Sequence, residues 1–538
     1  MIKALVLMLM VTAVHAGDLV LEHVSVVDVG NLTVNHEQTV WISGQQIKAI
    51  YPDHKARKSI PNDITRLDFS GKFVTPGLID AHVHHATDPE HHDNRSRTMQ
   101  FYQHYVRHGI TAVRDMGGDA RLLMGYKREA LLDNIQAPDI YYSAIIAGPE
   151  FFTDPRTVAS SKGHQSGTVP WIRAITHDSD WTQIIQQAQG IGATGIKIYR
   201  ELPGDILEPL VNEAHKQGIQ VWSHTYIYPA TPLDAINAGV QVVSHADGLV
   251  GTSKRDVTAW FEQGGRDFQE ILANADHHQV MTQMLDQDVI LDATLVIFEQ
   301  LGQQSELTQI RYELAKAMTK AAHQKGIKIT TGTDFPVQDL ADEPMLYREL
   351  KLLVEDVGMQ PIEAIQAATW HAALALGIGD THGQITVGRQ ANLAVFDQDP
   401  TANISHLSSL SHVLKNGQMV YRGMPPGLPF SAARKSGGQL WLSGQLGNVP
   451  GTKTLVAGGI KAEMQQTMIN IGHVLQEQQL DFDDLLQCTL MLADMNEWGQ
   501  ANEVYRTFFG QTLPARSAFA AAGLALGARV ELTCVAQL

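Results

Sequence analysis

Short apolar segments alternate eight times with stretches of helical periodicity in the central part of this 538-residue chain. This alternation is typical of repeated βα units, whose strands form a parallel sheet. Eight parallel strands close into a barrel, so the sequence predicts an α/β fold, a (β/α)₈ or TIM barrel, over residues 73–384. We expect its strands at residues 78–84, 110–117, 139–147, 195–199, 219–225, 241–247, 289–296 and 327–334.

Strand-like segments also flank this region on both sides. Residues 17–72 and 385–424 contain alternating or β-branched apolar runs separated by Gly, Asn and Pro. We expect the two flanks to fold together as a small composite β-sandwich. The proline- and glycine-rich run RGMPPGLPFS then marks a linker, and a second domain is expected at residues 425–538.

The N-terminus has the pattern of a secretory signal. Lys3 precedes an apolar run, and Val14-His15-Ala16 places acceptable residues at a cleavage site. A buried strand or a short membrane anchor is the alternative, but the run is shorter than the roughly 20 residues that span a bilayer. We therefore expect a signal peptide at residues 1–16 and a periplasmic or secreted protein without membrane attachment after cleavage.

Charge and cysteine content exclude several classes of function. The formal net charge is −17 and no cluster of Lys and Arg is present, which argues against nucleic acid or an anionic membrane as a partner. The two cysteines, Cys488 and Cys534, are too few for a disulfide scaffold. They are expected either to pair in an oxidising compartment or to remain as two buried thiols.

Residues that bind metals fall at the ends of several predicted strands. His82 and His84 are two apart in the first strand, so they point to the same side of it. In a chain with 24 histidines this pair alone is weak evidence. Four more candidates end other strands: Lys197, His224, His245 and Asp334. Each alone could be a solvated side chain or a helix cap, but all six converge at the end of a barrel where active sites lie, which predicts a metal site.

Several motifs make the region recognisable. FVTPGLIDAHVHH, GITAVRDMGG, GATGIKIYR and TGTDFP resemble the amidohydrolase superfamily, in the branch of imidazolonepropionase-like proteins and secreted Xaa-Pro dipeptidase-like carboxypeptidases. The resemblance extends over residues 18–424. It implies a metal-dependent hydrolase of an amide C–N bond.

The resemblance also implies a ligand set for two divalent ions. His82, His84 and Asp334 would hold the more buried ion, and His224 with His245 the more exposed one. Lys197 would bridge both ions as a carbamate, because an ammonium would be repelled whereas a carbamate offers two anionic oxygens. Imidazole and carboxylate ligands suit zinc, with manganese, cobalt and iron as alternatives. Mononuclear members of the family exist, and Lys197 is the residue that favours two metals.

A mechanism follows from this ligand set. A hydroxide bridging the metals would attack the amide carbonyl, and Asp334 would carry its proton to the leaving nitrogen. Tyr226 is expected to meet a substrate carboxylate or the oxyanion; it could instead be a packing residue, and Tyr228 is an alternative. The expected substrate is a dipeptide or an N-acyl amino acid, with cyclic amides or imidazolone-type rings as the runner-up. A metal-binding scaffold without turnover is the remaining alternative for the barrel.

The C-terminal region resembles a second family. PFSAARKSGGQLWLSGQLG and PARSAFAAAGLALGARVELTCVA resemble the YjgF/RidA imine deaminases, which have an α+β, chorismate-mutase-like fold and form trimers. The resemblance implies that Arg516 binds the carboxylate of a 2-imino acid and that Glu531 positions the attacking water. Phe430 replaces the family's tyrosine, and Ala518 replaces a common cysteine. Imine or enamine deamination, trimerisation alone and a non-catalytic small-molecule-binding tail all remain as roles of this domain.

Overall fold

The protein is described by a computed structural model covering residues 18–86, 94–250, 257–274, 277–336, 343–422, 430–448, 454–476, 478, 480–510 and 512–538. The expected signal peptide and most of the predicted linker lie outside these residues. The chain divides into two compact units, Met1–Tyr421 and Arg422–Leu538, and each is described by itself.

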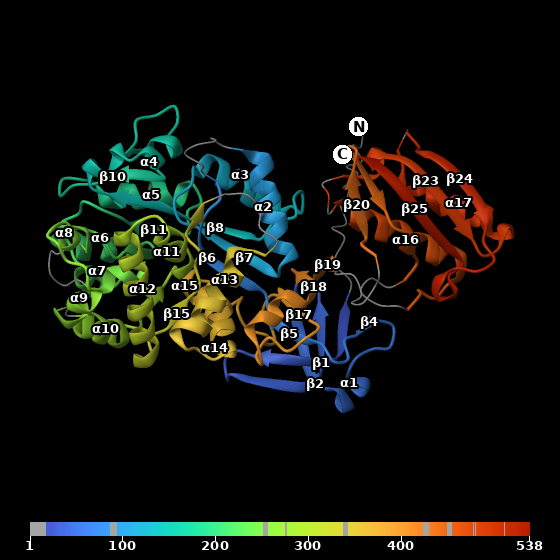
Figure 1. Ribbon diagram of the computed structural model, residues 1–538, viewed down its shortest axis with the longest axis horizontal. Coiled ribbons are helices and arrows are strands. Elements are labelled where there is room, and N and C mark those ends of the chain that lie inside the picture. Colours follow the sequence, from blue (N-terminus) through green and yellow to red (C-terminus); the bar gives the residue numbers. More distant parts are fainter. Residues whose placement is uncertain are drawn as a thin grey trace, which may run out of the picture. The chain divides into compact units, whose positions relative to one another are not determined.

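A parallel barrel forms the centre of the first unit (Figure 1). Its strands are β6 (Leu78–His84), β7 (Ile110–Asp115), β8 (Asp139–Ala147), β11 (Gly195–Ile198), β12 (Gln220–His224), β13 (Val242–Ser244), β14 (Ile290–Asp292), β15 (Ile329–Thr330) and β16 (Phe335–Pro336). β15 pairs with β14 and β16 pairs with β6, so the eighth strand closes the barrel in two pieces. The predicted (β/α)₈ barrel is thereby confirmed.

Helices connect these strands and surround the barrel. They are α2 (Arg95–Arg107), α3 (Ala120–Leu131), α4 (Pro155–Ser160), α5 (Trp181–Gly190), α6 (Gly204–Lys216), α7 (Pro232–Ala238), α8 (Val257–Glu262), α9 (Phe268–Asn274), α10 (His277–Asp286), α11 (Leu295–Gly302), α12 (Glu306–Lys325), α13 (Met345–Leu352), α14 (Pro361–Gln366) and α15 (Ala372–Ala375). The short strands β9 (Thr168–Val169) and β10 (Ile172–Ala174) extend the sheet beside β8. The longest helix, α12, begins with a capping box at Ser305 and ends at Gly326, whose φ of 82° is readily accessible to glycine.

Several predicted strands are longer than the observed ones; for example, residues 241–247 contain only β13 and residues 327–334 contain only β15. The apolar run at residues 289–296 was expected to be a strand throughout, but β14 ends at Asp292 and helix α11 begins at Leu295. Thr294 has a φ of 53°, which ends the extended conformation. The oxygens of the buried Glu349 carboxyl group then accept hydrogen bonds from the N–H groups of Leu295 and Val296 and so cap the helix. A short apolar run fits a buried helix as well as a strand, and here the cap favours the helix.

The two flanks of the barrel fold together, but where a β-sandwich was expected the strands belong to one continuous hydrogen-bonded sheet. Its eight strands are β1 (Leu19–Asp28), β2 (Thr33–Ser43), β3 (Gln46–Pro52), β4 (Thr65–Asp68), β5 (Phe73–Pro76), β17 (Leu393–Phe396), β18 (Leu410–Lys415) and β19 (Gln418–Arg422). Helix α1 (Asp53–Ser59) follows β3. β5 and β17 pair in antiparallel fashion and join the flanks, with Val74 opposite Val395 in the core of this sheet.

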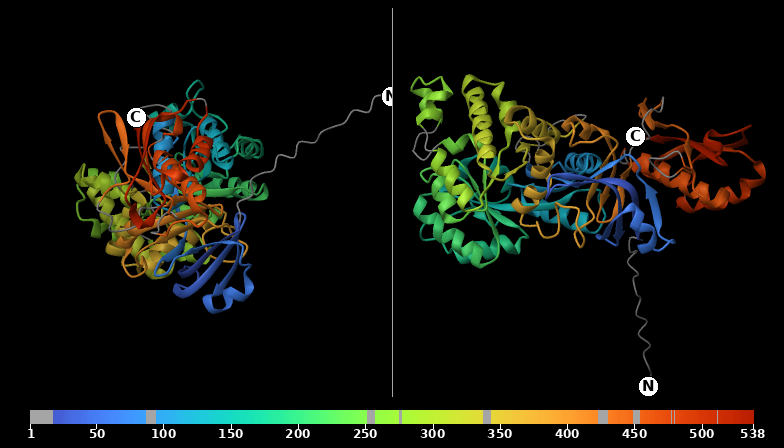
Figure 2. Two further views of the ribbon diagram at one scale, coloured as in Figure 1. Left: turned by 90° about the vertical axis from the view of Figure 1, so that its right-hand side faces the viewer. Right: turned by 90° about the horizontal axis from the view of Figure 1, so that it is seen from below.

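The second unit is an α+β domain. Its strands are β20 (Ala433–Ser436), β21 (Gln439–Leu442), β22 (Gln445–Leu446), β23 (Leu485–Leu492), β24 (Ala515–Ala520) and β25 (Val530–Gln537), and its helices are α16 (Gly459–Gln476) and α17 (Trp498–Tyr505). Both helices pack on one face of the sheet, where they share an apolar core with alternate strand residues (Figure 2). Cys488 and Cys534 lie opposite each other on β23 and β25 and form a disulfide, which decides between the two alternatives that the sequence left open.

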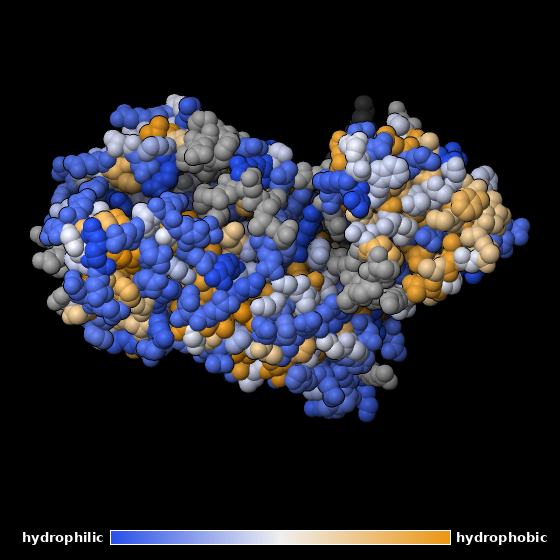
Figure 3. Space-filling view, in the orientation of Figure 1, coloured by the Kyte–Doolittle hydropathy of each residue, from blue (hydrophilic) through white to orange (hydrophobic). Residues whose placement is uncertain are grey.

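Among the described residues of this unit, no helix lies against the other face of the sheet. Trp441 on β21 and Phe519 on β24 alternate with residues that face the helices, and they are 52% and 49% exposed. Figure 3 shows apolar side chains gathered at the surface of this unit. Within the described part of the chain, none of the helices is both long and apolar enough to cross a membrane.

Candidate metal centre

Three of the predicted metal ligands form a compact group. His82 and His84 come from β6, and Asp334 lies between the two pieces of the eighth strand. Oδ1 of Asp334 is 3.3 Å from Nε2 of His82 and 3.0 Å from Nε2 of His84. The backbone N–H of Asp334 donates to the carbonyl of His82 over 2.7 Å. Asp334 itself has a φ of 51°, so the chain turns at this residue. The donor atoms all lie within 4.8 Å of one another, close enough for one cation.

Lys197 joins this group from β11. Its Nζ is 3.1 Å from Nε2 of His82, and the side chain is buried. Burial lowers the pKa of Lys197 to about 8. A neutral amine is the form of lysine that takes up CO₂, so the environment of Lys197 suits carbamylation.

The last two predicted ligands lie beside this group. The rings of His224 and His245 are 4.4 Å apart between centroids, and the His245 ring is 5.1 Å from that of His82. Burial lowers the pKa of His245 to about 3 and holds the pKa of His224 well below its usual range. Both imidazoles are therefore neutral, which is the form that binds a metal. The structure brings all six predicted residues together at the C-terminal ends of the barrel strands.

A second layer of residues holds the ligands in place. Asp292, at the end of β14, lies 2.7 Å from Nδ1 of His82 and also accepts a hydrogen bond from Ser244. The buried Arg114 approaches the same carboxylate at 3.5 Å. Thr294 lies 2.9 Å from Nδ1 of His245 through its hydroxyl. Such contacts fix the ring orientation of metal-binding histidines.

Sequence reasoning missed this second layer. Asp292 ends the observed strand β14 but lies inside the predicted strand 289–296, so its position did not give the signal that Asp334 gave. Thr294 and Arg114 carried none, because their contacts depend on how the barrel closes.

The chemistry of this donor set fits divalent cations. Four imidazoles, one carboxylate and a buried lysine surround a single region, and imidazole with carboxylate is a usual environment for divalent transition metals. Burial alone would penalise so many polar groups without a shared partner. The residues present therefore suit a divalent metal centre.

Of the two candidate tyrosines, Tyr226 lies next to the centre. Its ring is 5.7 Å from that of His224, whereas Tyr228 is 59% exposed. The Tyr226 hydroxyl donates to Oδ2 of Asp247 over 2.8 Å. Arg311 on α12 donates to the same oxygen through Nε over 2.7 Å. Asp247 and Arg311 were not anticipated from the sequence, since Arg311 lies far along the chain in a helix without a motif.

In the C-terminal domain, Arg516 and Glu531 do not meet within one chain. Arg516 is in register with the buried Cys488 and stacks over the ring of Tyr505 at 4.7 Å, on the helix side of the sheet. Glu531 lies between two buried residues of β25, so its side chain is on the open face. It packs over Gly444, where a Cβ would come within 1.9 Å of Oε1. Burial raises the pKa of Glu531.

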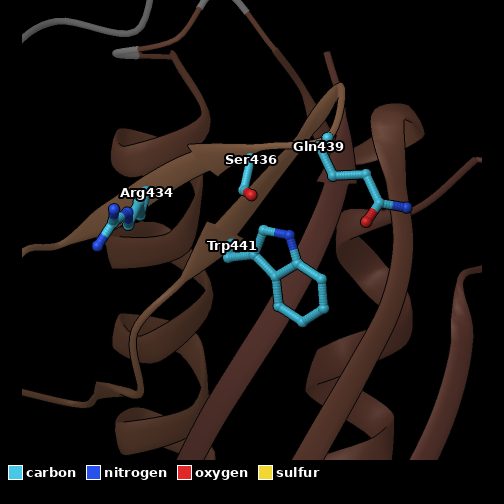
Figure 4. A pocket seen from close by; sticks show the side chains of 5 residues that line it. Arg434, Ser436, Gln439 and Trp441 are labelled. Atoms are coloured by element: carbon cyan, nitrogen blue, oxygen red, sulfur yellow. The ribbon is translucent and has the colours of Figure 1, made fainter.

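A shallow pocket lies on the β20–β21 hairpin of the same domain (Figure 4). It contains none of the residues that the sequence predicts for catalysis. Its lining consists of Arg434, Ser436, Gly437, Gln439 and Trp441.

Comparison with known proteins agrees with both parts of the structure. Residues 73–420 match the family described as "Amidohydrolase family", and residues 423–538 match the one described as "Endoribonuclease L-PSP". The barrel unit is similar in fold to a Xaa-Pro dipeptidase with bound methionine, with a TM-score of 0.60 at 21% identity over 76% of this chain and 100% of that one. It is also similar to A. niger ochratoxinase, with a TM-score of 0.60 at 19% identity over 77% of this chain and 97% of that one.

The barrel and its histidine, lysine and aspartate cluster define a hydrolase of carbon–nitrogen bonds, and the chain belongs to the amidohydrolase family, with an Endoribonuclease L-PSP domain at its C-terminus. A mouse 2-iminobutanoate/2-iminopropanoate deaminase is 40% identical over 108 residues, which cover 20% of this chain and 80% of the mouse protein.

Proposed function

We propose that the barrel hydrolyses the amide bond of dipeptides or N-acyl amino acids that carry a free carboxylate, with two zinc ions as cofactors. The observation that carries the proposal is the convergence of six side chains of the right chemistry: His82, His84, Lys197, His224, His245 and Asp334. The fold similarity to a Xaa-Pro dipeptidase supports the choice of substrate class.

Each residue of the centre has a proposed task. Divalent ions bound here would supply an acidified water and a Lewis acid for the scissile carbonyl. Lys197, as a carbamate, would offer two anionic oxygens to the ions, and Asp292 keeps the His82 ring in place. Asp334 accepts the proton of the attacking water and delivers it to the leaving nitrogen. Its carboxylate is suited to this task because it lies within 3.3 Å of two imidazoles and is fixed by the turn at the barrel seam.

The test combines metal analysis with a substrate screen. The full chain is purified, its metal content is measured, and libraries of dipeptides and N-acyl amino acids are assayed beside cyclic amides. We expect close to two metal ions per chain and turnover of linear substrates that is lost on chelation and restored by zinc. Turnover of cyclic amides alone, or a chain that is fully active without metal, would contradict the proposal.

For the C-terminal domain we propose a trimer with imine deamination at sites shared between copies. The support is that Arg516 and Glu531 occupy opposite faces of one sheet, so a site that uses both needs a second chain. The open face with Trp441 and Phe519 is the surface that such an assembly would bury. Sedimentation should give a trimer for the parent and smaller species for Phe519→Asp. A parent that sediments as a monomer would contradict the proposal.

We also propose that the protein is exported to the periplasm or the medium. The pattern at residues 1–16 and the Cys488–Cys534 disulfide support this, since stable disulfides belong to oxidising compartments. N-terminal sequencing of the protein from its native cells tests the proposal. A mature protein starting at Gly17 is expected, and one that retains Met1 or Ile2 would contradict it.

A further inference from the structure

Arg311 and Asp247 form a charged pair beside the metal centre that none of the proposed catalytic steps uses. Asp247 is fully buried, whereas the Arg311 side chain is 27% exposed. Nε of Arg311 donates to Asp247, and the Tyr226 side chain is a second hydrogen-bond partner of the guanidinium. The guanidinium is therefore held in place by two side chains, and its five N–H donors exceed the number that these two partners use.

Two aromatic rings hold this guanidinium next to the metal ligands. Cζ of Arg311 lies 5.2 Å from the centre of the Tyr226 ring and 5.5 Å from that of Phe298. Tyr226 contacts His224 at 5.7 Å, and Phe298 contacts His245 at 6.2 Å between ring centres. One aromatic ring thus separates Arg311 from His224, and another separates it from His245.

The chain builds this arrangement from two adjacent strand ends. Tyr226 follows His224 by two residues after β12, and Asp247 follows His245 by two residues after β13. Tyr226 and Arg311 both donate to Oδ2 of Asp247, and its Oδ1 is buried without a hydrogen-bond partner in the described part of the chain. A buried carboxylate with an unpaired oxygen costs stability, and arrangements of this kind are kept at functional sites.

We infer that Arg311, oriented by Asp247 and Tyr226, binds the free carboxylate of the substrate and selects substrates that carry one. An end-on guanidinium gives two parallel hydrogen bonds to a carboxylate, a geometry that lysine cannot match. In a dipeptide or N-acyl amino acid the carboxylate lies about one residue length, roughly 3.5 Å along the chain, from the scissile amide. The inference rests on the proposed amide hydrolysis and names the part of the substrate that the protein recognises.

The test measures binding without turnover. Calorimetry measures the affinity of the full chain carrying Asp334→Asn for N-acetyl-L-methionine and for its neutral analogue N-acetyl-L-methioninamide. Adding Arg311→Met should weaken binding of the acid by roughly 10–100-fold and leave that of the amide within about threefold, since only the acid loses charge-assisted hydrogen bonds. Arg311→Lys keeps the charge beside Asp247 and should weaken the acid less. Arg311→Lys also replaces Arg311→Met in this test if the methionine variant folds poorly.

Arg156 provides the matched control. It is another arginine whose charge acts on Asp334, but its Nε and one terminal nitrogen are occupied by Asp154 at 3.0 and 2.8 Å. Arg156→Met should leave the affinity for the acid unchanged. Equal loss of acid and amide in Arg311→Met, or loss of the acid in Arg156→Met but not in Arg311→Met, would overturn the inference. Selective loss of the acid in Arg311→Met, together with a parent that cleaves no linear amide, would uphold the carboxylate site and reject the proposed function.

Discussion

The proposal of two metal ions rests on Lys197. This lysine is buried against His82, and burial favours its neutral amine, the form from which a carbamate is made. The carboxylates of Asp334 and Asp292 act in the opposite direction and raise the pKa of Lys197, but burial has the larger effect.

Replacing Lys197 with alanine is expected to lower the metal content and to reduce turnover by at least about 10–100-fold, the size of effect that loss of even an outer-shell contact has. Short carboxylic acids added to the assay should restore part of the activity, because they can occupy the place of the carbamate. Metal analysis and a titration with acetate or propionate check this. Full activity with unchanged metal content would show that Lys197 does not bridge the ions.

A substitution at Asp334 tests proton transfer separately from metal binding. Asp334→Asn keeps an oxygen near the two imidazoles but cannot carry a proton, so we expect the fold to survive and turnover to fall by about 10²–10⁴-fold. Circular dichroism serves as the folding control. A variant within tenfold of the parent would mean that another group carries the proton.

At the scale of elements, the strands were the most predictable part of the structure. The limits of β6 and β8 match the predicted segments 78–84 and 139–147. These apolar runs are buried in a parallel barrel and are flanked by polar or turn-forming residues. Parallel topology then brings the strand ends together, so the approach of His82 to Lys197 follows from chain order. Arg311, Asp292 and Thr294 escaped prediction, because their roles depend on side-chain contacts between elements that are remote in sequence.

Glu349, whose cap on α11 shortened the predicted strand, makes a pH-dependent contribution to stability. Burial raises the pKa of Glu349 to about 8 from an ordinary value of 4.5. The native state therefore keeps a proton that the unfolded chain releases. The resulting contribution is complete below about pH 4.5 and is lost as the pH rises through about 8, by at most about 5 kcal/mol at 1.36 kcal/mol per pKa unit.

Glu349→Gln removes this titration. The midpoint of thermal unfolding should fall more steeply between pH 5 and 8.5 for the parent than for the variant. Other buried acids, such as Asp80, are common to both proteins, so the difference between the two curves isolates Glu349. Parallel curves would mean that Glu349 is ionised in the native protein across this range.

At the scale of the whole molecule, units of two different families share one chain. Tethering raises the concentration of one unit's product at the other, into the millimolar range for short flexible linkers. Hydrolysis of an N-acyl dehydroamino acid releases an enamine or imine, which is the type of substrate named for the deaminase relatives of the C-terminal domain.

We therefore predict that the chain converts N-acyl dehydroamino acids to a 2-oxo acid and ammonia, and that Arg516→Ala uncouples the two steps. In the variant, amide cleavage should continue while ammonia release lags behind it at the rate of spontaneous imine hydrolysis. Parallel assays of the freed acid and of ammonia check this. Equal ammonia release by parent and variant would leave the C-terminal domain with a role in assembly alone.

The barrel closes at the same place where the metal ligands lie. The eighth strand is split into β15 and β16, and Asp334 joins the seam through its hydrogen bond to the carbonyl of His82. Ions that bind His82 and Asp334 together would therefore also clamp the seam. Removal of these ions should accelerate amide hydrogen exchange along β6 and around residues 329–336 well before it does so in β8, which β7 separates from β6. The cofactor would then hold the barrel closed as well as supply its chemistry.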